Sequence, residues 1–147
     1  MDALTKSPYK IQTKVTIDAP QEKVWDALTK PEIIKQWFFG VDTVTDWKVG
    51  GPIVHKGEWK GKPYQDKGTV LEFDPPRTLS HSHWSSLSGL PDRLENYQDV
   101  TYAVTRRHGQ TEVTLIEANI PDEEARSQSE AAWTKVLGAL KDLVEYS

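Results

Sequence analysis

Two histidines separated by a single residue are the side chains of this sequence best suited to chemistry. His81 and His83 stand in an alternating stretch, so they share one face of a strand with Leu79. If Leu79 points inward, both imidazoles do as well, and they can hydrogen-bond a ligand hydroxyl or carbonyl inside an apolar pocket. A β-bulge in this strand would reverse the inference, because it shifts the register by one residue.

Two other interpretations of the histidine pair stay open. The pair could face water or lie at a pocket mouth with its hydrogen bonds satisfied, or it could provide two ligands of a metal site. Glu72 and Glu95 are the carboxylates that could supply a third ligand, but the spacing fixes neither of them. The prediction therefore includes no metal and no other cofactor.

Tyr97 and Trp59 are further candidates for a binding site. Tyr97 lies at the entry of a strand, where its hydroxyl could donate to a ligand or its ring could cover the sheet edge. Glu58 and Trp59 are neighbours, so only one of them faces inward. We expect Trp59 inside, because an unpaired carboxylate is costly to bury.

The sequence lacks the familiar catalytic motifs. It contains no Gly-x-Ser-x-Gly sequence, no cysteine and no Gly-rich phosphate loop after a strand. It therefore favours a binding protein over an enzyme, and no catalytic residue is predicted. A cyclase or dehydratase that uses His81 or His83 as general acid or base is the alternative.

Length and composition predict one domain over residues 1–147, with a loose N-terminus at 1–8. The chain has no cysteine, no secretory signal and no apolar run near the roughly 20 residues of a membrane span. These features predict a cytoplasmic protein without a membrane span. A net charge of −4 argues against a nucleic-acid partner.

Hydrophobic periodicity predicts the elements that position these side chains. Alternation between turn residues predicts seven antiparallel strands at 9–17, 41–47, 52–60, 63–73, 78–84, 96–107 and 111–119. Two short helices are expected between the first two strands: Pro20 lies near the start of one, with Asp18 or Ala19 as its cap, and Thr29 caps the other. A long C-terminal helix should follow a capping box at Ser127 and Glu130.

The long helix must cover one face of a bent sheet, and the gap between them should enclose an apolar pocket. Trp37 and Phe38 are expected at its helical lid. The strands and the long helix should supply the remaining lining residues, which are Trp47, Trp59, Leu79, His81, His83, Tyr97, Val100, Tyr102, Val113, Leu115, Trp133, Val136, Leu137 and Leu140. Each of these could equally fill a core.

The order and spacing of several motifs resemble the SRPBCC (START-like) superfamily, and within it the branch named for the activator of heat shock protein 90 ATPase. The motifs, spread over about 9–146, are Ile17-Asp18-Ala19-Pro20, Trp37-Phe38, Val49-Gly50-Gly51, Lys67-Gly68-Thr69-Val70-Leu71, Pro75-Pro76-Arg77-Thr78-Leu79, Glu95-Asn96-Tyr97 and Trp133. The resemblance implies an α+β helix-grip fold. In this fold a curved seven-stranded antiparallel sheet surrounds a long C-terminal helix, with two short helices between strands 1 and 2.

The superfamily includes ligand carriers, cyclases, dehydratases and co-chaperone domains, so the resemblance implies several functions. We expect first a protein that binds a small hydrophobic molecule of lipid-, polyketide- or polyphenol-like kind. Contact with a chaperone and a part in the stress response follow from the name of the branch. The eukaryotic co-chaperone has a further N-terminal domain for which this sequence leaves no room, so we expect chaperone activation less.

Overall fold

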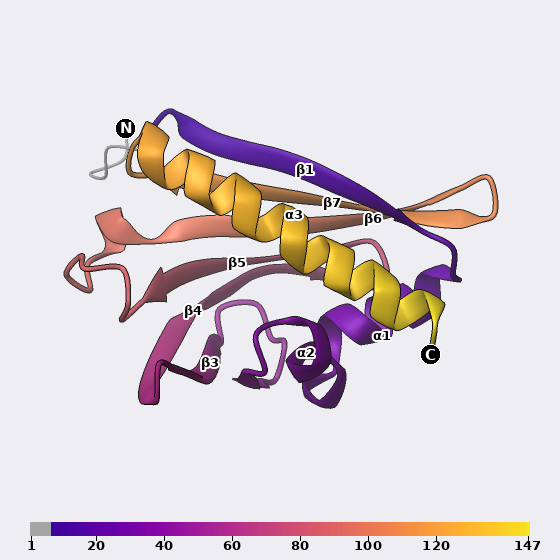
Figure 1. Cartoon of the computed structure of the whole chain (residues 1–147), viewed down its shortest axis with the longest axis horizontal. Coiled ribbons are helices and arrows are strands. Elements are labelled where there is room, and N and C mark those ends of the chain that lie inside the picture. Colours follow the sequence, from indigo (N-terminus) through magenta and orange to yellow (C-terminus); the bar gives the residue numbers. More distant parts are fainter. Residues whose placement is uncertain (1–6) are drawn as a thin grey trace.

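The computed structural model describes residues 7–147, so the loose start expected at 1–8 lies mostly outside the described residues. The elements follow one another in the predicted order (Figure 1). They are β1 (Tyr9–Ile17), α1 (Gln21–Thr29), α2 (Pro31–Trp37), β2 (Asp42–Thr45), β3 (Pro52–Trp59), β4 (Lys62–Asp74), β5 (Thr78–Ser85), the 3-10 turn η1 (Leu94–Asn96), β6 (Gln98–Arg107), β7 (Gln110–Ile120) and α3 (Glu123–Glu145).

The seven strands form a single antiparallel sheet in the order β1-β7-β6-β5-β4-β3-β2. The first two strands of the chain therefore lie at opposite edges, and α1 and α2 make the connection between them. The long helix α3 runs diagonally along the sheet beside β1, with α1 and α2 near its C-terminal end (Figure 1). The predicted helix-grip fold is thereby confirmed.

The inner face of the sheet is defined by the pairing of β5, β6 and β7. Leu79 lies opposite Tyr102, and Tyr102 lies opposite Leu115. All three side chains are buried, together with Leu137 and Leu140 of α3. Alternation along β5 then places His81 and His83 on the same inner face as Leu79.

A β-bulge does occur beside this face, but it lies in β4. The β4–β5 pairing shifts between Val70 and Glu72, whereas β5 pairs with β6 without interruption from Thr78 to His83. The bulge therefore changes the register of the neighbouring strand and leaves the histidines facing inward.

Three of the predicted helix caps are wrong. Asp122 caps α3 by accepting a hydrogen bond from the Ala125 N–H at 2.8 Å, so the helix begins before the capping box expected at Ser127. Helix α2 has Lys30 at its N-cap without a side-chain bond, because the Thr29 hydroxyl donates back to the Trp25 carbonyl at 2.8 Å. Helix α1 begins one residue later than expected, with Pro20 as its N-cap and no side-chain cap.

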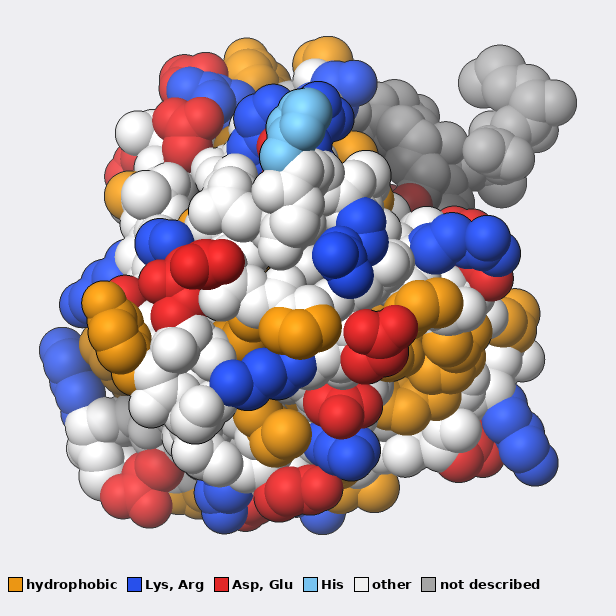
Figure 2. Space-filling view, turned by 90° about the vertical axis from the view of Figure 1, so that its right-hand side faces the viewer, with side chains coloured by type: hydrophobic (Ala, Val, Ile, Leu, Met, Phe, Trp, Pro, Cys, Tyr) orange, Lys and Arg blue, Asp and Glu red, His pale blue; other side chains and the backbone are white. Residues whose placement is uncertain are grey.

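The C-terminal turn of α3 is fastened to the end of β1. The Glu145 carboxylate accepts a hydrogen bond from the Asp18 N–H at 2.8 Å, and the Lys141 ammonium donates to the Thr16 carbonyl at 3.0 Å. This end of the molecule carries interspersed acidic and basic side chains with apolar ones between them (Figure 2). The contacts hold α3 against the sheet edge at the end far from its capped N-terminus.

Candidate functional site

Most of the side chains expected around a pocket are packed into the core. Nine of them are at most 7% exposed and form part of one hydrophobic cluster: Trp37, Leu79, Val100, Tyr102, Val113, Leu115, Val136, Leu137 and Leu140. Phe38, Trp47 and Trp133 are partly buried and pack against this cluster. A role of these residues in ligand contact stays a prediction.

Within residues 7–147, two hollows open at the surface. One, of about 320 Å³, lies between the N-terminal end of β1 and the η1 turn, where Asn96 and Asn119 line it. The other, of about 390 Å³, lies on the β3–β4 hairpin beside Tyr64. Neither is lined by a residue of the predicted pocket.

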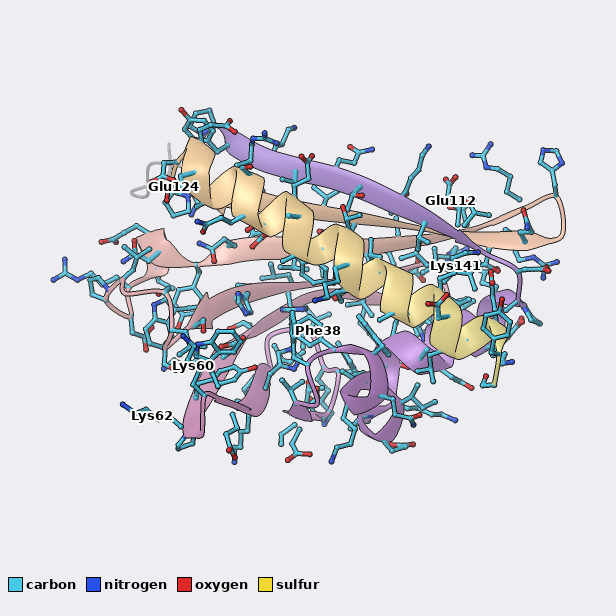
Figure 3. All side chains as sticks on the ribbon, in the orientation of Figure 1. Phe38, Lys60, Lys62, Glu112, Glu124 and Lys141 are labelled. Carbon is cyan, nitrogen blue, oxygen red and sulfur yellow. The ribbon has the colours of Figure 1, made fainter. Side chains whose placement is uncertain are left out.

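Trp59 lies outside the interior, contrary to the prediction. Its side chain is 58% exposed, and Glu58 beside it is exposed as well. The Lys60 ammonium lies 5.7 Å from the centre of its ring. The hairpin tip of β3 and β4, marked by Lys60 and Lys62, extends away from α3 (Figure 3).

Tyr97 also lies away from the histidines. Its ring stacks on Trp84 with centroids 6.4 Å apart, and its hydroxyl donates to Asp92 at 2.6 Å. Trp84 follows His83 in β5, so it points to the opposite face of the sheet. Tyr97 therefore packs on the outer face and cannot orient a ligand held by His83.

Trp47 closes the end of the interior beside α1. The strand β2 stops at Thr45, and Trp47 has a positive φ of 61° beyond the strand end. Its indole donates to the Thr29 carbonyl at 2.9 Å, and its ring stacks on Phe73 at 5.3 Å. These contacts belong to an aromatic cluster separate from the histidines.

A third histidine, which we did not predict, faces the pair. The His55 ring on β3 lies 5.9 Å from the His81 ring, measured between centroids. Its Nδ1 is hydrogen-bonded to the Thr43 hydroxyl at 2.9 Å. The signal that could have found it is the alternation of Ile53 and His55, since Ile53 is a buried core residue of the same strand.

Asp66 joins His83 to this cluster. In the register of the sheet Asp66 lies opposite His55, and His83 Nε2 donates to its Oδ2 at 3.0 Å. Among the described residues, Asp66 Oδ1 is buried without a hydrogen-bond partner. Burial is the largest single influence on the pKa of Asp66 and would raise it. The hydrogen bond and the charge of His83, with smaller contributions from Ser85 and His55, together outweigh burial and lower that pKa below its usual value.

A second buried carboxylate links the cluster to α3. The Trp133 indole donates to Glu117 Oε1 at 3.1 Å, and Trp133 also stacks on Phe38 with centroids 5.7 Å apart. Phe38 makes an edge contact with the His55 ring at 5.6 Å. Burial raises the pKa of Glu117, although nearby His83 and the hydrogen bond from Trp133 act in the opposite direction.

Burial also keeps two of the imidazoles neutral. It lowers the pKa of His55 to about 3 and the pKa of His81 to about 4, and repulsion from the neighbouring histidines adds to the effect at both. At neutral pH these two rings therefore carry no charge. The interior thus holds a polar cluster, composed of His55, Asp66, His81, His83 and Glu117.

Within residues 7–147, no group of three or more His, Cys, Asp or Glu side chains has the geometry of a metal site. Glu72 lies opposite Ser80 rather than His81 and is exposed, and Glu95 is exposed in the η1 turn. Neither carboxylate joins the histidine pair. None of the helices in this part of the chain is long and apolar enough to cross a membrane.

Replacing the indole donor tests how much the buried carboxylate depends on α3. Trp133→Phe keeps a ring against Phe38 but removes the hydrogen bond to Glu117. We expect the free energy of unfolding to fall by about 1–3 kcal/mol at pH 8. The loss should be smaller at pH 5, because the raised pKa of Glu117 leaves a larger fraction of its carboxyl protonated there than at pH 8. Urea titrations at the two pH values measure this, and Trp59→Phe at an exposed position is the matched control. An equal loss for both variants would contradict the expectation.

The sheet, the covering helix and the buried cluster define a helix-grip protein of START-like type. The family model described as "Activator of Hsp90 ATPase homolog 1-like protein" matches residues 18–145, and the chain belongs to this family. No curated protein matches the chain.

Solved structures agree with this assignment. The ChR145 protein of Cytophaga hutchinsonii is 45% identical over 97% of both chains, with a TM-score of 0.82. The Aha1 dimer of Colwellia psychrerythraea is 23% identical over 92% of this chain and 96% of that one, with a TM-score of 0.74. DynU16, a protein of the dynemicin biosynthetic locus, is 20% identical over 95% of this chain and 48% of that one, with a TM-score of 0.79. The latter two likenesses concern the fold.

Proposed function

We propose that the protein binds a small, mainly apolar molecule between its sheet and α3, with the buried polar cluster at the polar end of the ligand. The observation that carries the proposal is the cluster itself: three imidazoles and two carboxylates on the inner face of an otherwise apolar core. Burying such groups costs stability, which apolar side chains in the same places would avoid. Strongly perturbed titratable groups cluster at functional sites, so such a cluster is a candidate for one.

Phe38 is the side chain that a ligand would displace. It lies between α2 and α3 (Figure 3) and contacts both Trp133 and His55. The two residues after it, Phe39 and Gly40, both have positive φ values, 55° and 68°. The backbone of Phe38 is held by hydrogen bonds to Ile34 and Val41, so a change of its side-chain rotamer would move the ring away from Trp133 and His55.

Burial of the ligand would provide the affinity. An aromatic molecule that buries about 200 Å² of apolar surface gains about 5 kcal/mol before the costs of association are subtracted. Contacts with the Trp133 ring would add the modest preference of aromatic pairs for stacked geometry. This arrangement favours planar ligands of polyketide or polyphenol kind over flexible acyl chains.

A screen of planar aromatic and lipid-like compounds by amide chemical-shift changes tests the proposal. Binding should shift the amides of residues 38, 55, 81 and 133. Phe38→Ala should bind the same compound several-fold more tightly because no side chain has to be displaced, whereas Phe39→Ala, at a position 63% exposed, should bind as the wild type does. Failure of every compound to bind either the wild type or Phe38→Ala would overturn the proposal, and so would shifts confined to the outer face around Trp84.

A proton-transfer enzyme is the second candidate, and the His83–Asp66 hydrogen bond favours it. A carboxylate that accepts from one nitrogen orients an imidazole and leaves the other nitrogen free for general acid–base catalysis. His83→Gln should then abolish turnover of a bound compound without changing its Kd. Turnover that survives this substitution would exclude His83 as the catalytic group.

Activation of a chaperone ATPase is the function that the family description adds. A direct measurement is the rate of ATP hydrolysis by a purified heat shock protein 90 homologue, with and without this protein. An increase that persists in His81→Phe would assign the effect to the surface rather than to the interior cluster. If the protein acts by ligand binding alone, we expect no increase in the rate of ATP hydrolysis. We also propose that the protein is cytoplasmic.

A further inference from the structure

The hydrogen bonds within the cluster fix which nitrogen of His81 can bind a ligand. Its Nδ1 lies 2.9 Å from the Ser82 carbonyl oxygen, and a carbonyl oxygen can only accept, so Nδ1 carries the proton. Burial keeps the pKa of the ring near 4, so the ring holds one proton at neutral pH. Nε2 of His81 therefore has a lone pair and accepts a hydrogen bond.

The carboxylates near His81 also favour a ligand that donates hydrogen bonds over one that accepts them. Asp66 keeps a buried acceptor atom, Oδ1, without a partner among the described residues, while its other oxygen binds the N–H of His83. Glu117 accepts from Trp133 on the α3 side of the cluster. Two buried acidic groups thus flank the histidines, and Lys67, which follows Asp66 in β4, pairs instead with Asp92 on the outer face.

Tyr102 is a buried hydroxyl that could donate to a ligand. Tyr102 lies opposite Leu115, and Glu117 is two residues further along β7 on the same face. Burial raises the pKa of Tyr102, and the negative charge of Glu117 raises it further. An anionic ligand that accepted a hydrogen bond from Tyr102 would therefore lie beside the charge of Glu117. Electrostatic repulsion in a buried site makes that arrangement unfavourable.

We infer that the interior site selects uncharged apolar molecules that carry a hydroxyl or N–H group for His81 Nε2, and that it rejects carboxylates. The inference rests on the proposed function and narrows it to a class of ligand. A ligand donor would bind the lone pair of His81 Nε2. A ligand without a donor would leave that lone pair unused, and a fatty acid or other anion would meet Asp66 and Glu117.

Three naphthalenes of nearly equal size test this selectivity: 2-naphthol, 2-methoxynaphthalene and 2-naphthoate, titrated at pH 7.5 and followed by amide chemical shifts. We expect 2-naphthol to bind with a Kd about five- to tenfold lower than that of 2-methoxynaphthalene, and 2-naphthoate to bind most weakly. His81→Phe should bring the first two Kd values together. Asp66→Asn should strengthen binding of 2-naphthoate, while Tyr97→Phe, on the outer face, should change none of the three values.

The outcomes separate the inference from the proposed function. Equal binding of all three probes, or preference for 2-naphthoate, would overturn the inference and leave binding between sheet and helix intact. Absence of binding by every probe would count against the proposed function, and the inference would fall with it. The ¹⁵N chemical shifts of the His81 ring in the wild type give an independent measurement: a proton on Nε2 at pH 7.5 would overturn the inference without reference to any variant.

Discussion

Gly68→Ala is expected to lower the free energy of unfolding by about 3 kcal/mol or more, or to prevent folding altogether. A Cβ at Gly68 would lie 1.7 Å from the Ser82 carbonyl oxygen and 2.4 Å from its carbonyl carbon. Both atoms belong to the backbone of β5, so no side chain can move aside to make room. The strands would have to separate beside the bulge in β4, where the pairing is already shifted.

Gly138→Ala is the matched control, because it makes the same chemical change with the opposite expected sign. Gly138 lies inside α3, and a Cβ there would meet nothing within 4 Å. Alanine favours the helix over glycine by up to about 1 kcal/mol, so this variant should be more stable than the wild type. Urea unfolding of both variants provides the comparison. A Gly68→Ala protein with the stability of the wild type would contradict the close approach of β4 and β5.

That close approach also determines the geometry of the site. Asp66 lies two residues before Gly68 on the same face of β4, and His83 follows Ser82 in β5. Because the strands come close at Gly68, His83 Nε2 reaches Asp66 Oδ2 at 3.0 Å. If the Gly68→Ala protein folds with reduced stability, we therefore expect the His83–Asp66 hydrogen bond to be broken in it.

The fold could be predicted because each element carries its own local pattern. Alternation identifies a strand such as β5, and the change to a 3.6-residue period identifies α3. The caps were harder to predict. Ser127 and Glu130 have the spacing of a capping box, but the same spacing also occurs in the interior of a helix. Asp122 provides the actual cap because it lies two residues after the end of the last strand, where the chain must turn.

The site could be predicted only in part, because it depends on register between strands. Alternation alone places His81 and His83 on one face. It cannot show that His55 lies opposite Asp66 or that Glu117 lies opposite Val100, since those pairings depend on hairpin lengths and on the bulge in β4. Sequence patterns likewise cannot show where the helices stop covering the sheet, and this coverage decides the exposure of Trp59.

Acid should destabilise the protein strongly, because two of its buried histidines are held neutral. Burial lowers the pKa of His55 to about 3 and that of His81 to about 4, whereas in the unfolded chain both titrate near 6.5. Between these values the unfolded state binds protons that the folded state does not. Stability is therefore fully present above about pH 6.5 and falls as the pH decreases toward 4. At about pH 4.5 each histidine should account for a loss on the order of 2–3 kcal/mol.

The carboxylates of the cluster modify this loss in opposite directions. The lowered pKa of Asp66 increases the loss of stability in acid, because the unfolded state takes up this proton at a higher pH than the folded state does. The raised pKa of Glu117 reduces the loss, because there the folded state takes up the proton at the higher pH. Urea midpoints measured from pH 8 to pH 4.5 give the slope. His55→Gln should reduce the slope by about half, and His108→Asn, in the exposed β6–β7 turn, should leave it unchanged. A flat profile down to pH 4.5, or a slope reduced by His108→Asn, would mean that the interior histidines are accessible to protons and not buried as neutral groups.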